Sequence, residues 1–148
     1  MITVREATSQ DTATIVQLIV DLAATIGERT SLSEAYVEEY LQFPGSKALL
    51  GEVDGQVAGL ISYTLHPNLY HAGETCLIEE LVVCQEARGQ GVGRSLLTEL
   101  FSRLESVGCI EVSVSTMPDN VGAIRFYKAH GMLDEAILLE KHFTKNTL

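Results

Sequence analysis

A glycine-rich segment between an apolar run and an amphipathic helix is the feature that most constrains this chain. Residues 88–94 read RGQGVGR and follow the strand-like run TCLIEELVV at residues 75–83. Apolar residues at three- and four-residue spacing then predict a helix that Gly108 ends. The glycines let successive backbone N–H groups converge, and the helix N-terminus adds unsatisfied donors and a positive dipole end. With Arg88 and Arg94 adding charge, the segment predicts a pocket for phosphate or pyrophosphate.

Three other interpretations of this segment compete with the anion pocket. A P-loop requires GxxxxGK[ST], and no Lys follows any of these glycines. A dinucleotide-binding GxGxxG motif would need glycine where Arg94 stands. Glu111 has the spacing of a ribose-binding acid, but hairpin strands ahead of the motif do not suit a first βαβ unit. A flexible loop with helix-terminal glycines is the remaining alternative.

The charge of the chain limits its partners. Its 148 residues include 20 acidic and 10 basic side chains, a formal net charge of −10. This excess argues against a nucleic-acid partner, because such proteins present Lys and Arg to phosphates. Cationic or neutral partners are easier to bind, and an anionic ligand needs a local pocket that acts against the overall field.

Cysteine and histidine usage and hydropathy predict the location and exclude a metal site. Three cysteines, an odd number without CxxC spacing, suggest reduced thiols. Charges at the N-terminus exclude a signal peptide, and the longest uncharged run is a poor membrane span. The four histidines have no metal-ligand spacing. We therefore expect a cytoplasmic protein without a membrane partner or a metal.

The hydrophobic pattern predicts one α+β domain over residues 1–148. The order is β-α-α-β-β-β-α-β-α-β, with an antiparallel start and one parallel crossover in a mixed, mostly antiparallel central sheet. Asp54-Gly55 predicts a type I′ hairpin turn. The expected strands are residues 2–6, 48–53, 56–65, 75–83, 110–116 and 137–143. The expected helices cover residues from about 8 to 24, from about 31 to 43, after the glycines to 108, and 120–130.

Two adjacent carboxylates, Glu79 and Glu80, lie in the middle of the strand before the glycines. Neighbouring residues of a strand point to opposite faces, so we expect one of the two to face inward or into a cleft. Burial of a carboxylate is costly unless the group has a partner or a role.

The chain resembles the GNAT superfamily of acetyl-CoA-dependent N-acyltransferases. The R/Q-x-x-G-x-G/A signature of that family matches residues 88–93, and the strand LIEELVV precedes it. A second signature matches NVGAIRFYKAHG at residues 120–131. The two occur in the order and at the separation typical of the family, and the element order matches from residue 2 to residue 143.

The resemblance implies a role for each motif. Backbone groups of the splayed strand end would bind the pantetheine arm of acetyl-CoA and polarise the thioester carbonyl. The amides of the glycine segment would hold the pyrophosphate. The residues implied in these two roles are Leu81, Val82, Val83, Arg88, Gly89, Gln90, Gly91, Val92, Gly93 and Arg94. The strand end can equally be ordinary sheet core.

Side chains complete the implied site. Asn120 would contact the cofactor, or it caps the last helix. Tyr127 would contact the cofactor and protonate the departing thiolate as general acid, or it is an amphipathic core tyrosine. Glu79, ranked first, or Glu80 would take the proton of the amine, directly or through water. Either carboxylate can instead pair with an arginine or face solvent.

The implied reaction moves an acetyl group directly from acetyl-CoA to a primary amine. Acidic residues on the two early helices suit a small cationic acceptor, although a solvated helix face explains them equally well. Two alternatives stay open: a protein acetyltransferase acting on a peptide N-terminus or lysine, and a non-catalytic acyl-CoA-binding sensor. We also expect a homodimer.

Overall fold

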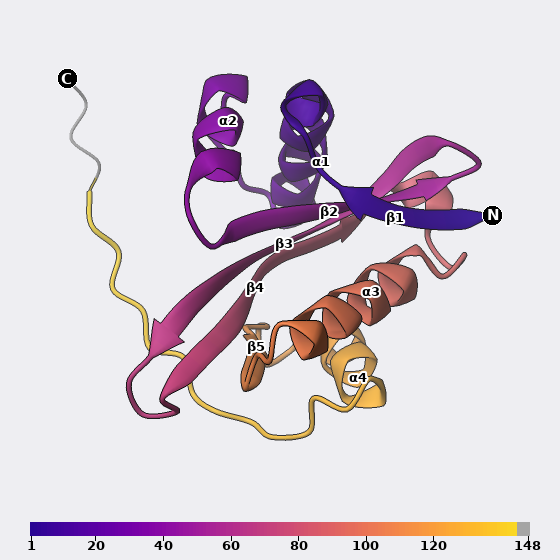
Figure 1. The fold of residues 1–148 in the computed structure, drawn as a ribbon. Coiled ribbons are helices and arrows are strands. Elements are labelled where there is room, and N and C mark those ends of the chain that lie inside the picture. The colour runs from indigo at the N-terminus through magenta and orange to yellow at the C-terminus, as the bar shows by residue number, and fades with distance from the viewer. Residues whose placement is uncertain (145–148) are drawn as a thin grey trace. The chain divides into compact units, whose positions relative to one another are not determined.

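The computed structural model describes residues 1–144 (Figure 1). The chain divides into two compact units, Met1–Val114 and Ser115–Leu148. The elements of the first unit follow in chain order: β1 (Ile2–Glu6), a 3-10 turn (Ser9–Asp11), α1 (Thr12–Thr25), α2 (Glu34–Gln42), β2 (Ser46–Val53), β3 (Gln56–Asn68), β4 (Gly73–Val83), a second 3-10 turn (Gln85–Ala87), α3 (Val92–Ser106) and β5 (Glu111–Val114). The second unit contains α4 (Val121–Ala129).

The first unit is built on one mixed sheet with strand order β1-β2-β3-β4-β5. The first three pairings are antiparallel, and β5 pairs with β4 in parallel after the α3 crossover. The predicted type I′ turn between β2 and β3 is confirmed, because Asp54 and Gly55 both have positive φ, at 49° and 84°. The α+β class and the mostly antiparallel sheet with one parallel crossover are likewise confirmed.

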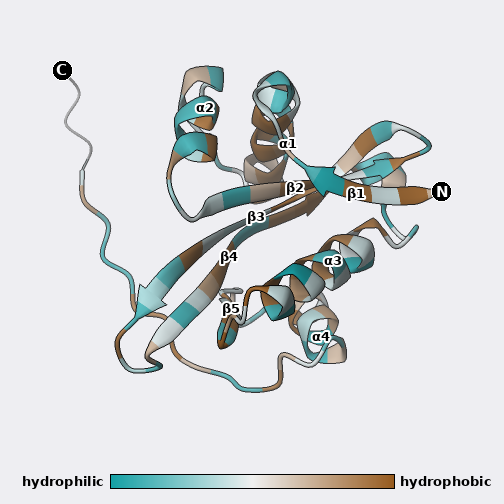
Figure 2. Ribbon diagram, viewed as in Figure 1, coloured by the Kyte–Doolittle hydropathy of each residue, from teal (hydrophilic) through white to brown (hydrophobic). Residues whose placement is uncertain are grey.

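Helices cover both faces of this sheet (Figure 1). On one face, α1 and α2 pack against the sheet around a core that joins Ile15, Leu18, Val37, Ala48, Leu50, Leu60 and Val82. On the other face lies α3, whose apolar stripe includes the fully buried Leu96, Leu97 and Leu100. The brown apolar stretches of the strands run between these layers in Figure 2. Both helix layers therefore use the apolar spacing seen in the sequence.

Two glycines let α3 approach the sheet closely. A Cβ at Gly51 would lie 2.9 Å from Val92 Cγ1, and one at Gly59 would lie 2.9 Å from the same atom and 3.0 Å from the Val82 carbonyl oxygen. Val92 is the first residue of α3. The absence of side chains at Gly51 and Gly59 therefore lets the N-terminus of α3 pack closely against β2 and β3.

An ion pair joins β1 to the start of α1. Arg5 donates from Nη2 to Asp11 Oδ1 and from Nη1 to Asp11 Oδ2, both at 2.9 Å. The Thr8 backbone N–H donates to the same carboxylate at 2.7 Å, as part of a capping box. These bonds hold the pKa of Asp11 at about 2, below its usual range, mainly through the Arg5 hydrogen bonds.

The second unit corrects one prediction. The helix expected over residues 120–130 is α4, but residues 137–143 form no strand. Their apolar residues Ile137, Leu138 and Leu139 are consecutive rather than alternating, and all three are exposed. A strand requires a ladder partner for its backbone groups, and no ladder includes this segment among residues 1–144.

No helix within residues 1–144 is both long and apolar enough to cross a lipid bilayer. The prediction of a single domain over residues 1–148 stays a prediction.

Candidate functional site

The glycine segment forms the turn that begins α3. Gly89 and Gly91 have φ of 79° and 93°, a left-handed conformation that other residues rarely adopt. The first bond of the helix is donated by Ser95 N–H to the Gly91 carbonyl oxygen at 3.0 Å. The N–H groups of the three preceding residues therefore have no helical acceptor and point out of the N-terminus. This arrangement suits an anion.

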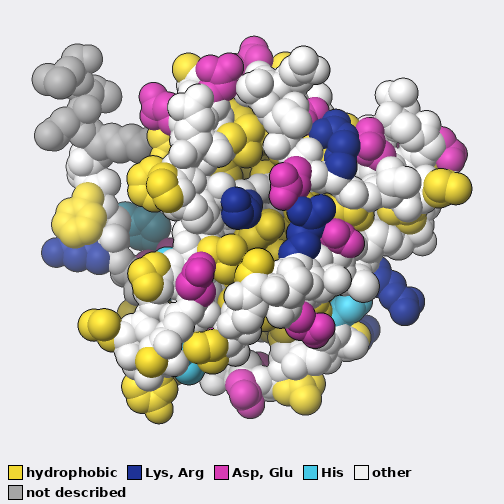
Figure 3. Space-filling model, viewed as in Figure 1, with side chains coloured by type: hydrophobic (Ala, Val, Ile, Leu, Met, Phe, Trp, Pro, Cys, Tyr) yellow, Lys and Arg dark blue, Asp and Glu magenta, His cyan; other side chains and the backbone are white. Residues whose placement is uncertain are grey.

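The arginines at the ends of the segment have no carboxylate partner in the part of the chain that the structure describes. Both are exposed, and neither pairs with an acid within residues 1–144. Arg88 Nε instead donates to the Val83 carbonyl oxygen at 3.2 Å, which ties the glycine segment to the end of β4. By contrast, Arg5 and Arg103 bind acids, and blue and magenta side chains lie side by side in the middle of Figure 3. Positive charge is thus available at the glycines.

The end of β4 has an open edge next to this turn. β5 pairs with β4 only from Thr75 to Ile78, whereas β4 continues to Val83. Beyond Ile78, the β5 side of β4 has no ladder partner among the residues that the structure describes. The opposite side still pairs with β3, where Leu81 faces Ile61 and Val82 faces Leu60. Residues 81–83 are therefore paired within the sheet on their β3 side and form an open edge on the other side.

A β-bulge places Glu79 and Glu80 on the same face of β4. Ser62 of β3 lies opposite Glu80, but the next residue, Tyr63, lies opposite Ile78, so Glu79 is the extra residue. Ser62 Oγ donates to Glu80 Oε2, and Thr64 Oγ1 donates to Glu79 Oε1 at 3.3 Å. Ser62 and Thr64 are two residues apart on β3 and share a face. The expectation of opposite faces is therefore wrong, because the bulge interrupts the alternation.

The two carboxylates differ in burial. Glu79 is exposed, whereas Glu80 is half-buried and its backbone N–H donates to Ser62 Oγ at 3.0 Å. Burial raises the pKa of Glu80, the Ser62 hydroxyl lowers it, and the neighbouring charge of Glu79 raises it again, with a net rise. A base with a raised pKa accepts a proton more readily near neutral pH. The environment therefore favours Glu80 over Glu79, the reverse of the order expected from the sequence.

Tyr40 of α2 lies close enough to this carboxylate pair for both charges to act on its phenol, and sequence reasoning missed it. Its hydroxyl donates to the Lys47 carbonyl oxygen at 3.0 Å and lies 3.2 Å from that of Tyr63. Burial, then the charges of Glu80 and Glu79, raise the pKa of Tyr40. Ser62 was also missed. A small polar residue within the apolar run AGLISYTL was the available signal for it.

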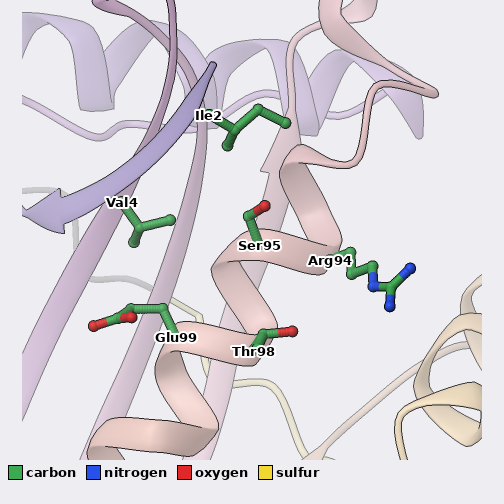
Figure 4. Close-up of a pocket in the computed structure, with 6 residues that line it drawn as sticks. All are labelled: Ile2, Val4, Arg94, Ser95, Thr98 and Glu99. Atoms are coloured by element: carbon green, nitrogen blue, oxygen red, sulfur yellow. The ribbon is translucent and has the colours of Figure 1, made fainter.

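A hollow of about 390 Å³ separates β1 from α3 (Figure 4). Ile2 and Val4 line it from the strand, and the α3 side consists of Arg94, Ser95, Thr98 and Glu99. In Figure 4 the Arg94 side chain points away from β1, and the Glu99 carboxylate already binds Arg103 Nε at 2.9 Å. Arg94 therefore directs its charge away from the β1 side of this hollow, and the anion-binding features belong to the glycine turn.

The remaining candidates lie on α4. Asn120 is the N-cap of this helix, and its Oδ1 accepts from Ala123 N–H at 3.1 Å. Tyr127 is half-buried, and burial raises the pKa of its phenol. Its ring makes an edge contact with Phe126 at a centroid distance of 5.2 Å. The phenol therefore keeps its proton through a wide pH range.

Cys76 is poorly suited to act as a nucleophile, and the described residues contain no metal-binding cluster. Cys76 is buried, which raises its pKa to about 12, so its thiolate is scarce at neutral pH. No group of three His, Cys, Asp or Glu side chains within residues 1–144 has the arrangement needed to hold a metal ion.

Similarity to known proteins agrees with this geometry. Residues 15–132 match the model of the acetyltransferase (GNAT) family. An aminoalkylphosphonate N-acetyltransferase of Salmonella typhimurium is 30% identical over 127 residues, covering 86% of this chain and 82% of that protein. A bovine (Bos taurus) thialysine N-epsilon-acetyltransferase is 26% identical over 142 residues, covering 88% and 84%.

Solved structures share the fold. A transcriptional regulator of Bacillus halodurans C-125 superimposes with a TM-score of 0.84 at 27% identity, covering 97% of this chain and 100% of that one. An aminoglycoside acetyltransferase from an uncultured soil metagenomic sample has a TM-score of 0.83 at 17% identity, covering 98% and 97%, which shows the fold alone. The chain therefore belongs to the acetyltransferase (GNAT) family and is an acyltransferase.

Proposed function

We propose that the protein moves an acetyl group from acetyl-CoA directly to the primary amine of a small cationic molecule. The observation that carries this proposal is the half-buried Glu80, just before the open edge of β4 and the glycine turn. Family membership and the two N-acetyltransferase relatives support the transfer to nitrogen.

The chain has the groups that acetyl-CoA requires. The orphan N–H groups at the start of α3, with Arg88 and Arg94, which pair with no acid within residues 1–144, fit a pyrophosphate. The open edge at residues 81–83 offers backbone donors and acceptors to an extended pantetheine arm and its thioester carbonyl. Asn120 completes the cofactor contacts in this proposal, and its capping bond leaves the side-chain amide N–H groups available.

Glu80 acts as the base in this proposal. The amine must lose a proton as its nitrogen attacks the acetyl carbonyl, and a carboxylate with a raised pKa is suited to take it. Glu79 lies on the same face, and its negative charge helps to hold a cationic amine there. The C–N bond forms as the C–S bond breaks.

Tyr127 acts as the acid that returns a proton to the departing thiolate. Burial keeps its phenol protonated at neutral pH, which an acid requires. This role rests on the match of residues 120–131 to the family signature. A cytoplasmic location and a homodimer stay predictions.

The test is acetyl-CoA turnover, measured as free thiol, against a panel of small amines and peptides. The proposal expects turnover with small cationic amines. Turnover only with peptides would establish a protein acetyltransferase instead. If the folded protein binds acetyl-CoA but releases no thiol with any amine or peptide, the result would establish a sensor.

A further inference from the structure

A hollow of about 310 Å³ lies between α2 and the start of β2. Its lining residues, which define the α2 hollow, are Tyr36, Glu39, Tyr40, Phe43 and Ser46. The first four are spaced three and four residues apart and thus share one face of the helical segment. Tyr36 and Phe43 are 59% and 66% exposed, so two large rings stand at the surface without the packing that usually holds them. The hollow therefore offers aromatic surface to a ligand.

The α2 hollow adjoins the carboxylate pair of the proposed active site. Ser46 lies opposite Thr64 in the β2–β3 ladder, and Thr64 donates to Glu79. The Tyr40 ring lines the hollow, while its hydroxyl lies 3.2 Å from the Tyr63 carbonyl oxygen, one residue after the Ser62 that binds Glu80. A small molecule with its reacting nitrogen at Glu80 can therefore extend along Tyr40 into the hollow.

The chemistry of the lining selects for positive charge. Glu39 has no ion-pair partner within residues 1–144 and is exposed. Among the residues that the structure describes, no Lys or Arg lines the hollow. Lys47 follows Ser46 in the strand, so its side chain points to the opposite face of the sheet. Ammonium groups bind the faces of Tyr and Phe rings and pair with carboxylates, whereas a phosphonate or carboxylate would be repelled by Glu39, Glu79 and Glu80.

We propose that the α2 hollow binds a second ammonium group of the acceptor, so that the preferred substrates are small dicationic amines such as alkyl diamines. This inference rests on the proposed function. It distinguishes the chain from its relative named for aminoalkylphosphonates, because the second group of the acceptor is positive rather than negative.

The test compares three acceptors of equal chain length: an alkyl diamine, the matching amino alcohol, and the matching aminoalkylphosphonate. The diamine is expected to have a kcat/KM at least about tenfold above that of the amino alcohol, since one charged contact is added. The phosphonate is expected to be the poorest acceptor. Equal values for diamine and amino alcohol, or a preference for the phosphonate, would overturn the inference.

Variants locate the effect in the hollow. Glu39→Gln and Tyr36→Ala should each reduce the preference for the diamine over the amino alcohol several-fold, through KM rather than kcat. Glu38→Gln removes the adjacent acid of α2, which does not line the hollow, and should leave the preference unchanged. An unchanged preference in both hollow variants would contradict the inference.

Calorimetry separates this inference from the proposed function. If no acceptor is acetylated, the proposed function fails, and diamine binding still tests the hollow. Wild type should then bind the diamine more tightly than Glu39→Gln does. Equal affinity for the two proteins would overturn the second-ammonium site by itself.

Discussion

Removal of the Ser62 hydroxyl tests the assignment of Glu80 as the base. Ser62 is 6% exposed, so little water can replace its hydrogen bond to the Glu80 carboxylate. This bond stabilises the charged form, and its loss in Ser62→Ala must raise the pKa of Glu80 further. A hydrogen bond to a charged group contributes about 1.5–3 kcal/mol, and 1.36 kcal/mol corresponds to one pKa unit. The shift should therefore be about one to two units.

The assay is the pH dependence of kcat/KM with one amine and saturating acetyl-CoA. Because the base must be unprotonated, activity rises with pH through the pKa of Glu80. The acid limb should move upward by about one unit or more in Ser62→Ala. An acid limb that stays in place or moves downward would refute the assignment. Because the same amine is used with every variant, its own titration cancels when the pH profiles are compared.

Thr64→Val is the matched control, because Thr64 donates to Glu79 instead. With Glu80 as the base, this variant should leave the acid limb where it is in the wild type. A shift in Thr64→Val without one in Ser62→Ala would assign the base to Glu79. Thermal unfolding of both variants checks that each is folded.

Three further predictions concern stability and the proposed acid. Gly59→Ala should lower the free energy of unfolding, measured in urea, by about 1–2 kcal/mol, because the new Cβ overpacks the contact with α3. Gly122→Ala, where no atom lies within 4 Å of the new Cβ, should raise that free energy by about 0.5–1 kcal/mol. Equal effects of the two substitutions would contradict the close packing of α3. Asp11→Asn should lower the free energy of unfolding by about 1 kcal/mol at pH 7. The depressed pKa of Asp11 corresponds to about 2 kcal/mol, and solvent screening at the half-exposed Arg5 reduces that value. Because the pKa of Asp11 is depressed in the folded protein, this contribution to stability is present above the unfolded pKa of 3.8 and should vanish as the pH falls through about 2. A difference in unfolding free energy between wild type and Asp11→Asn that stays constant with pH would be inconsistent with the ion pair. Tyr127→Phe should reduce kcat about a hundredfold while acetyl-CoA affinity stays within about twofold, and unchanged turnover would remove Tyr127 from the mechanism.

Local signals in the sequence predicted most of the first unit. The Asp54-Gly55 turn and the apolar stripe of α3 each depend on nearby residues, and both were right. The segment at residues 137–143 has strand-like composition, but a strand depends on a ladder that no single segment supplies. Its prediction failed for that reason.

The candidate site shows the same division. The glycine turn could be located from its residues, because backbone conformation and helix position decide its chemistry. The faces on which Glu79 and Glu80 lie could not be predicted, because a one-residue bulge interrupts the alternation of the strand and has no local signal in the sequence. Tyr40 and Ser62 join the site only through tertiary contacts: Tyr40 packs from α2 onto β3, and Ser62 of β3 binds Glu80 of β4.

A single-turnover experiment distinguishes direct transfer of the acetyl group to the amine from transfer through an acetylated enzyme. Enzyme in excess over isotopically labelled acetyl-CoA is mixed with a cationic amine, and labelled amine, free thiol and intact enzyme are measured by mass spectrometry over time. We expect acetylated amine and free thiol to appear together, with no acetylated enzyme at any time, and Glu80→Gln to slow the appearance of both. Thiol release without acetylated amine, or an acetylated enzyme that forms first, would contradict direct transfer.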